Sequence, residues 1–113
     1  MIHRGEVWVG NLNPSRGKEV GKIRPVLVIQ ADALTQAGAE TVIVLPLTTQ
    51  VRPGWRRFRI PLPARDRLLM ASYVVIDKPR ALDPARLVDG PLTRLTDEEM
   101  TAVEQSLGAV LGM

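Results

Sequence analysis

Two short apolar runs, residues 25–29 and 41–47, constrain the fold of this chain more than any other feature. Both are rich in the β-branched residues Val and Ile. Their length fits a strand that is buried on both faces better than it fits a helix. Pro46 lies inside the second run and predicts an edge or a bulge near its end, because proline cannot donate to a strand ladder. The two runs therefore predict a sheet with buried strands.

Further strand patterns flank these runs. Residues 6–12 are expected to form the first strand, and residues 57–60 alternate between polar and apolar, as a strand with one wet face does. Residues 72–76 and 80–82 predict two further short strands. Asn13 and Pro14 begin a turn after the first strand. Asp83 and Pro84 predict one helical turn, with Asp83 as its cap. Five or six short strands indicate a small antiparallel barrel or a strongly curved sheet.

The end of the chain predicts a helix. Thr96 and Glu99 have the spacing of a capping box, in which each side chain bonds to the backbone of the other residue. An apolar stripe follows at helical spacing, formed by Met100, Val103, Leu107, Val110 and Leu111. We expect the stripe to pack on the domain's own sheet, and a partner-binding face is the alternative. The expected fold class is mainly β with a C-terminal α-helix.

Composition limits the chemistry. The chain has 113 residues, expected to form one domain over 1–113, and 45% of them are hydrophobic. The formal net charge is +3, with arginines concentrated at 52–67. This favours an acidic or phosphate-bearing partner, although ordinary surface scatter is the alternative. The absence of cysteine excludes disulfides, thiolate metal sites and cysteine nucleophiles. With no secretion signal and no apolar stretch of membrane-spanning length, we expect a cytoplasmic protein without a membrane partner.

A basic loop, residues 17–24, leads into the first buried strand and places Arg24 at its mouth. The planar fork of an arginine can grip a phosphate in two places, as a lysine cannot. The loop is not a P-loop, because only three residues separate Gly17 from Gly21 and Lys22 is followed by Ile23. The single histidine, His3, gives little support to a metal site or a serine triad.

RNA cleavage suits such a site, because RNA supplies its own nucleophile, the 2′-hydroxyl. The protein must align that oxygen with the phosphorus and stabilise a more negative phosphorane. Arg24 can stabilise the charge, and Thr48, Thr49 and Gln50 offer neutral donors at the end of another strand. The residues alone leave alternatives open. Arg24 can instead pair with Glu6 or Glu19, and Thr48 and Thr49 can satisfy backbone groups.

Four motifs in order carry a resemblance to a known family. They are residues 4–8 (Arg-Gly-Glu-Val-Trp), the loop from Asn13-Pro14 to Arg24-Pro25, residues 46–49 (Pro-Leu-Thr-Thr), and residues 77–83 followed by Arg86-Leu87. Together and in register they resemble the MazF/PemK (Kid) family, the ribonuclease toxins of bacterial toxin–antitoxin pairs. The resemblance covers almost the whole chain.

The resemblance implies a small SH3-like barrel of the CcdB/Kid/MazF type that forms a homodimer. It implies a sequence-specific endoribonuclease, an mRNA interferase that arrests growth by cutting single-stranded RNA without a metal or other cofactor. The expected products carry a 2′,3′-cyclic phosphate and a 5′-hydroxyl. A cognate antitoxin would lay an acidic, partly disordered segment along the RNA groove.

The resemblance also assigns roles to residues. Arg24 and Thr48 match the catalytic arginine and threonine, and Glu19 and Asp77 match acidic positions that are possible acid/base groups. Because a guanidinium does not normally release its proton, Arg24 suits phosphorane stabilisation, and Glu19 or Asp77 is the more natural base. Two departures matter. Lys18 and Val75 stand where some members have histidine and arginine, so the subgroup that depends on those residues is not matched.

The expected RNA-binding residues are polar, basic or aromatic side chains around these positions: Lys18, Lys22, Thr49, Gln50, Arg52, Trp55, Arg56, Lys78 and Arg80. Trp55 can stack on a base or pack on the barrel, and the sequence leaves both open. The rival function is a non-enzymatic toxin of the same fold that poisons DNA gyrase, as CcdB toxins do. Those toxins present a tryptophan at the end of the last helix, which residues 108–113 lack.

Overall fold

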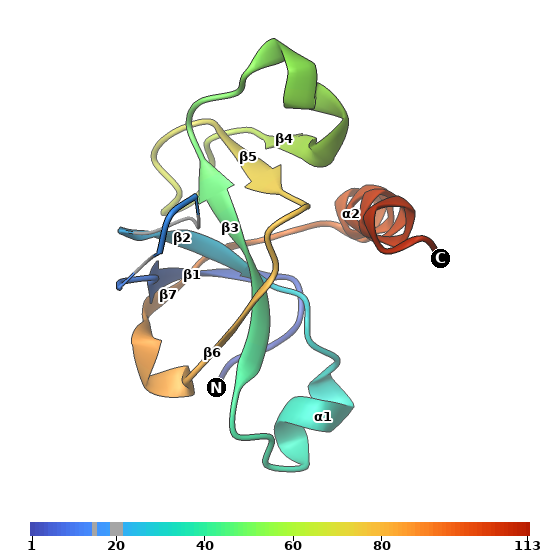
Figure 1. Ribbon diagram of the computed structural model, residues 1–113. Helices are drawn as coiled ribbons and strands as arrows, with labels where there is room; N and C mark the ends of the chain where they lie inside the picture. The colour runs from blue at the N-terminus through green and yellow to red at the C-terminus, as the bar shows by residue number, and fades with distance from the viewer. Residues whose placement is uncertain (15, 19–21) are drawn as a thin grey trace.

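The fold is a curved antiparallel sheet with one long helix (Figure 1). The computed structural model describes residues 1–14, 16–18 and 22–113. The strands are β1 (Glu6–Asn11), β2 (Ile23–Val28), β3 (Val42–Thr48), β4 (Arg59–Leu62), β5 (Ser72–Val75), β6 (Arg80–Leu82) and β7 (Leu87–Arg94). The helices are α1 (Asp32–Gln36) and α2 (Asp97–Leu111), and two 3₁₀ turns are η1 (Pro53–Phe58) and η2 (Pro84–Arg86).

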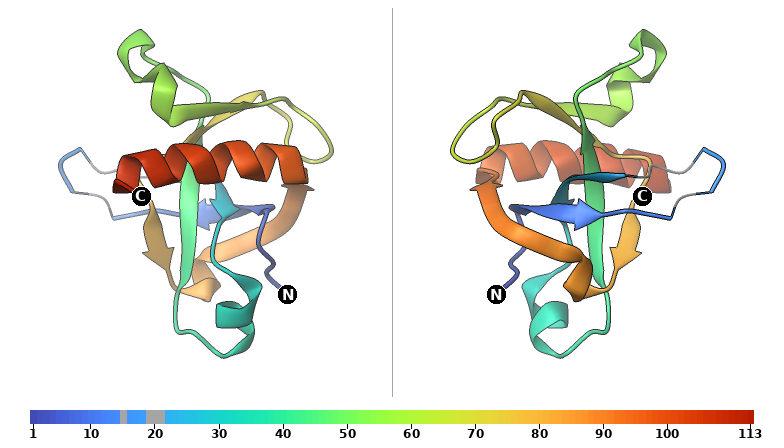
Figure 2. Two further views of the ribbon diagram at one scale, coloured as in Figure 1. Left: turned by 90° about the vertical axis from the view of Figure 1, so that its right-hand side faces the viewer. Right: turned by 90° about the vertical axis from the view of Figure 1, so that its left-hand side faces the viewer.

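All strand pairs are antiparallel. The sheet runs in the order β4-β5-β3-β2-β1-β7, and β6 pairs with β3 beside this path. Among the described residues the path does not return from β7 to β4, so the sheet curves like a barrel but stays open. Figure 2 shows how β7 bends around one side while α2 lies across the sheet. The predicted class, mainly β with a C-terminal helix, is confirmed.

The strand β2 is buried on both faces, as its apolar run predicts. Leu27 belongs to a core cluster that includes Val7, Leu45 and Leu47. Val26 and Val28 point to the opposite face and join a second cluster with Leu12, Val42, Val44, Leu82 and Leu87. Successive residues of a strand point to opposite faces, so one short apolar segment serves both cores. The end of β2 therefore lies between the two cores, whereas its first residues, Ile23 and Arg24, are at least partly exposed at the edge of the fold.

The sequence predicts an edge or a bulge at Pro46, and the edge is wrong, because β3 has neighbouring strands on both sides. On one side β3 pairs with β2, where Pro46 lies opposite Val26. On the other side β6 pairs with Val42–Val44 and β5 pairs with Leu47–Thr48. Pro46 therefore lies where β3 changes its neighbour, and there the missing N–H interrupts no ladder.

The helix α2 packs on the sheet through its apolar stripe. Met100 and Val103 are buried in the first core cluster, and Leu107 and Val110 pack against it. The Thr96 hydroxyl accepts from the Glu99 N–H at 3.1 Å, and the Glu99 carboxylate accepts from the Thr96 N–H at 2.8 Å. The predicted capping box is present, and the stripe serves the domain's own core.

Three elements differ from the sequence predictions. Arg57 and Phe58 lie in η1 rather than in a strand, with the guanidinium of Arg57 5.8 Å from the centre of the Phe58 ring. The helix α1 and the strand β7 had no prediction. The sequence of β7 contains Gly90 and Pro91, which resemble a turn, and residues 89–92 bulge opposite Trp8. Gly90 is needed there, because a Cβ at this position would lie 2.1 Å from the Trp8 ring.

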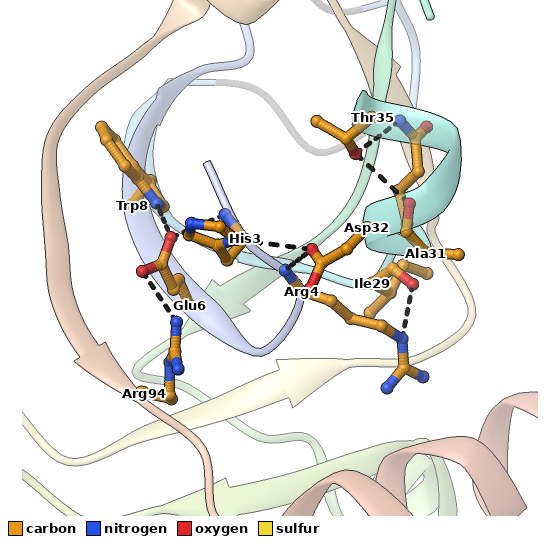
Figure 3. A network of polar contacts seen from close by, with 10 residues as sticks. His3, Arg4, Glu6, Trp8, Ile29, Ala31, Asp32, Thr35 and Arg94 are labelled. Carbon is orange, nitrogen blue, oxygen red and sulfur yellow. Dashed lines mark hydrogen bonds and ion pairs between the residues drawn. The ribbon is translucent and has the colours of Figure 1, made fainter. Parts of the chain in front are cut away.

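A polar network attaches the N-terminal segment to the sheet (Figure 3). The buried Glu6 carboxylate accepts from the His3 N–H at 2.7 Å and the Trp8 indole at 3.2 Å, and pairs with Arg94 at 3.1 Å. The Arg4 N–H donates to Asp32 at 2.7 Å. The motif at residues 4–8 thus has a structural role, and the Glu6 carboxylate pairs with Arg94 instead of Arg24.

Candidate active site

The strand register brings Arg24 and Thr48 together. Val26 lies opposite Pro46, so continuing the antiparallel register by two residues places Arg24 opposite Thr48. Directly opposed residues of two strands point to the same face. The Arg24 guanidinium reaches across to β3 and donates to the Leu47 carbonyl at 3.2 Å. Both side chains are partly exposed, so a ligand can reach them.

These two residues line a pocket of about 420 Å³. One side comes from the start of β2 and the end of β3, and the other comes from the β4–β5 connection and β7. The lining residues are Lys22, Arg24, Pro25, Leu47, Thr48, Thr49, Gln50, Arg67, Leu68, Leu69, Met70, Ser72 and Leu92. The pocket therefore unites five site residues predicted from the sequence: Lys22, Arg24, Thr48, Thr49 and Gln50.

The pocket is strongly cationic. Lys22, Arg24 and Arg67 line it, and its described lining contains no carboxylate. Partial burial lowers the pKa of the Arg24 guanidinium from its usual value. An arginine remains protonated at neutral pH even so. The result is a fixed positive charge that is partly withdrawn from water, where it interacts more strongly with an anion than a fully solvated charge does.

The backbone at Lys22 is strained. Its φ is +72°, in the left-handed region that favours glycine. Two hydrogen bonds hold it there: the Lys22 N–H donates to the Asn13 side chain at 2.8 Å, and the Leu12 N–H donates to the Lys22 carbonyl at 2.9 Å. Non-glycine residues in the left-handed region are enriched at functional sites, and Lys22 lines the same pocket as Arg24.

The Thr48 hydroxyl accepts a hydrogen bond from the Gln50 N–H at 3.2 Å. A hydroxyl has one proton to donate and two lone pairs. The contact with Gln50 uses a lone pair, so the O–H can still donate to an oxygen of a bound ligand. Arg24 and Thr48 together offer a charged donor and a neutral donor to one anion.

Seven of the predicted residues that the structure describes do not line the pocket: Lys18, Arg52, Trp55, Arg56, Asp77, Lys78 and Arg80. Asp77 pairs with Arg59 at 2.6 Å and does not line the pocket. The Lys78 amine donates to the Lys18 carbonyl at 2.8 Å, and Arg80 donates to the Leu12 carbonyl at 3.1 Å. Both cations thus contact the backbone of the β1–β2 connection. Glu19 lies outside the described residues.

The basic segment at η1 is exposed. Arg52, Trp55 and Arg56 all face solvent, and the Trp55 side chain is 47% exposed. The Trp55 ring tilts against Phe58 with 5.9 Å between ring centres, and the Arg59 guanidinium lies 6.0 Å from the centre of the Trp55 ring. Trp55 is thus partly packed and partly open. Figure 1 shows η1 projecting beyond β4 and β5.

Sequence reasoning missed the second wall of the pocket. Arg67, Leu68, Leu69 and Met70 lie between β4 and β5 in a segment with no strand or helix periodicity. The only available indication was an apolar triplet placed directly after charged residues, which is too common to indicate a site.

No three His, Cys, Asp or Glu side chains within 1–14, 16–18 and 22–113 gather closely enough to hold a metal ion. In that same part of the chain, no helix combines the length and apolarity needed to cross a membrane.

This combination of fold and pocket occurs in a chain that is similar to known toxins. A cationic pocket at the rim of a small, mainly β fold suits an anionic ligand. Residues 3–111 match the family of PemK-like, MazF-like toxins of type II toxin–antitoxin systems. The chain is 32% identical over 114 residues to endoribonuclease EndoA of Bacillus subtilis (strain 168), covering 100% of this chain and 97% of that protein. The chain belongs to this toxin family.

Solved structures agree on the fold. A crystal structure of MazF from Deinococcus radiodurans has a TM-score of 0.84 and 26% identity, covering 99% of this chain and 97% of that one. A MazE–MazF structure from the same organism has a TM-score of 0.75 and 27% identity, covering 99% and 96%.

Proposed function

We propose that this member of the MazF-like toxin family is a sequence-specific endoribonuclease that cuts single-stranded mRNA in the cytoplasm. The observation that carries the proposal is that Arg24 and Thr48 line the same cationic pocket. The endoribonuclease name of the Bacillus subtilis relative supports it. The proposed reaction is attack of the RNA 2′-hydroxyl on the adjacent phosphorus, leaving a 2′,3′-cyclic phosphate and a 5′-hydroxyl, with no metal.

The pocket residues suit this reaction step by step. Lys22 and Arg67 attract the RNA backbone into the pocket. The Thr48 hydroxyl donates to a non-bridging phosphate oxygen and fixes its orientation for in-line attack. Arg24 donates to the phosphorane, whose extra negative charge it stabilises more than that of the ground state. The half-buried position of Arg24 strengthens this effect, because water competes less for the guanidinium.

Proton transfer needs a separate group, because Arg24 keeps its proton. Glu19 and Asp77 are the candidates predicted from the sequence. Asp77 is held by Arg59 away from the pocket of its own chain, so a role for Asp77 requires the pocket of a second copy in a homodimer. The pH–rate profiles of Glu19→Gln and Asp77→Asn decide between them. Loss of the acidic limb in only one variant identifies the base, and an intact limb in both removes both candidates.

The remaining RNA contacts follow from exposure and charge. We assign backbone contacts to Lys18, Arg52 and Arg56, and neutral donors to Thr49 and Gln50, because these side chains are exposed. We assign base stacking to the half-exposed Trp55. Lys78 and Arg80 act on RNA indirectly, through the loop they support.

We further propose a homodimer and control by a cognate antitoxin. A cationic pocket fits the acidic segment that the family resemblance implies, and MazF of Deinococcus radiodurans has been solved with MazE. Light scattering tests the dimer directly. The match to the MazF-like toxin family favours the nuclease over a gyrase poison. A supercoiling assay with wild-type protein checks this, and inhibition of gyrase would contradict it.

The test of the nuclease is a map of 5′ ends on a long RNA incubated with the protein in EDTA. Discrete cuts are expected from the wild type and from Arg94→Lys, a control that keeps a surface cation outside the pocket. Arg24→Ala is expected to abolish the cuts. Intact RNA after incubation with folded wild-type protein contradicts the proposal.

A further inference from the structure

Two large apolar side chains stand exposed at the mouth of the pocket. Leu69 is 84% exposed and Met70 is 63% exposed, and both line the pocket. They follow Leu68, which is 3% exposed and anchors the same segment in the core. Adjacent exposed apolar residues beside a pocket indicate a binding surface more often than isolated ones do.

The segment that carries them is firmly attached. Arg65 and Leu68 exchange two backbone hydrogen bonds of 2.9 Å, which close a tight turn. The Arg67 N–H donates to the Leu92 carbonyl at 2.9 Å, which joins the turn to β7. Leu69 and Met70 therefore project from a fixed support and not from a loose loop tip.

Side chains strengthen the attachment. The Arg65 guanidinium donates to both carboxylate oxygens of Glu99, at 2.7 and 3.0 Å, at the start of α2. The Thr93 hydroxyl donates to Asp66 at 2.7 Å and accepts from Arg65 at 3.2 Å. Two-point contacts of this kind fix direction as well as distance.

The pocket thus has two chemically different walls. Lys22, Arg24 and Thr48 offer charge and hydrogen bonds, and Leu69 and Met70 offer apolar surface. A nucleotide has the matching division, because its phosphate is anionic and the face of its base is apolar. Single-stranded RNA presents such bases unstacked, ready to lie against a protein side chain.

We propose that Leu69 and Met70 form the base-contacting wall of the pocket, against which the base next to the scissile phosphate lies, and so help to set the cleavage sequence. This inference rests on the proposed function. The cationic opposite wall favours a nucleotide over a purely apolar occupant. A second copy of the chain covering Leu69 and Met70 is the other occupant that the test must detect.

The first experiment compares cleavage maps of one long RNA cut by the wild type and by the double variant Leu69→Ala/Met70→Ala. We expect the variant still to cut, with base preference at one position next to the cut reduced about tenfold, the lower end for lost apolar contacts in a pocket. Leu34→Ala is the matched control, since Leu34 is an exposed apolar residue on α1, and α1 lies at the opposite end of the molecule from β4 and β5 (Figure 1). An unchanged preference in the double variant overturns the inference and leaves the nuclease intact. Conversion of a wild-type dimer to a monomer by the double variant also overturns it.

The second experiment does not depend on cleavage. Oxidation of Met70 by hydrogen peroxide is followed by mass spectrometry with and without a 2′-O-methyl copy of a cleaved sequence, or a random 2′-O-methyl pool if no cut is found. We expect the RNA to slow oxidation of Met70 several-fold and to leave the exposed Met113 unaffected. Protection of Met70 by RNA without any cleavage would overturn the proposed nuclease, and with it the role of Leu69 and Met70 in setting a cleavage sequence, and would leave only an RNA-binding surface. Equal oxidation of Met70 with and without RNA overturns the proposal that Leu69 and Met70 contact the base.

Discussion

The attachment of the pocket wall predicts a pH-dependent loss of stability in Glu99→Gln. In the wild type, the Arg65 fork contacts both oxygens of Glu99, and the two side chains are 26% and 23% exposed. The substitution removes the charge but keeps an oxygen that can accept the Thr96 N–H, so the helix cap survives. The change therefore isolates the ion pair.

The expected loss lies between two limits. Fully exposed pairs contribute about 0.2–1 kcal/mol, and hydrogen bonds to charged groups about 1.5–3 kcal/mol. A partly buried, two-point pair with one weaker hydrogen bond left in the variant corresponds to about 1–1.5 kcal/mol. For a domain of this size, that lowers the melting temperature by roughly 3–8 °C.

The pH dependence follows from the pKa of Glu99, which the hydrogen bond from Arg65 lowers against a smaller opposing effect of burial. The same pair raises the pKa of Arg65, to which Asp66 also contributes. A carboxyl group whose pKa is lower in the folded state stabilises the fold above its unfolded pKa, about 4.3, and loses this effect as the pH falls further. The stability gap between wild type and Glu99→Gln is therefore full at pH 7 and small at pH 3.

Urea unfolding of both proteins at equal concentration, at pH 7 and pH 3, measures this gap. Subtracting the two curves at each pH removes the contribution of all other carboxyl groups. Glu98→Gln is the matched control, an exposed glutamate in the same first turn of α2. A gap of the same size at both pH values, or no gap at pH 7, refutes the reasoning.

Three other substitutions test separate parts of the account. Gly90→Ala is expected to destabilise the fold by about 1–3 kcal/mol in urea unfolding, because its Cβ would meet the Trp8 ring, whereas Gly54→Ala, which meets nothing within 4 Å, stays within about 0.5 kcal/mol. Arg24→Lys is expected to lower kcat about 100-fold, since one charge remains but the fork is lost, with an unfolding free energy within about 1 kcal/mol of wild type. Thr48→Val is expected to lower kcat by about tenfold or more with KM little changed, and a change confined to KM would contradict its proposed role in orienting the phosphate.

The sequence predicts much of this fold because local and global preferences agree. The apolar runs are buried strands, and the Thr96–Glu99 capping box starts the helix where the spacing indicates. The predictions fail where tertiary contacts decide. Gly90 and Pro91 resemble a turn, yet they lie within a long strand that bends around Trp8. Pro46 resembles an edge signal, yet it lies where β3 changes partners.

The candidate site likewise has residues that the sequence predicts and residues that only the tertiary structure brings together. Arg24 and Thr48 each lie at the end of a predicted strand, so their meeting follows once the two strands pair in the observed register. Leu69 and Met70 could not be predicted, because their position depends on a turn held by contacts between residues far apart in the sequence. Likewise, the sequence could not show that Asp77 lies outside the pocket, because its place is set by the ion pair with Arg59, eighteen positions away in the chain.

The chemistry of the cleaved ends tests the central claim most directly. A single-stranded RNA that is cut by the wild type in EDTA is compared with the same RNA carrying one 2′-deoxy nucleotide on the 5′ side of the scissile phosphate. The account predicts 2′,3′-cyclic phosphate and 5′-hydroxyl ends from the first RNA and no cut at the deoxy position in the second. Cleavage at the deoxy position, or products with 5′-phosphate and 3′-hydroxyl ends, would show that the 2′-hydroxyl is not the nucleophile and would contradict the account.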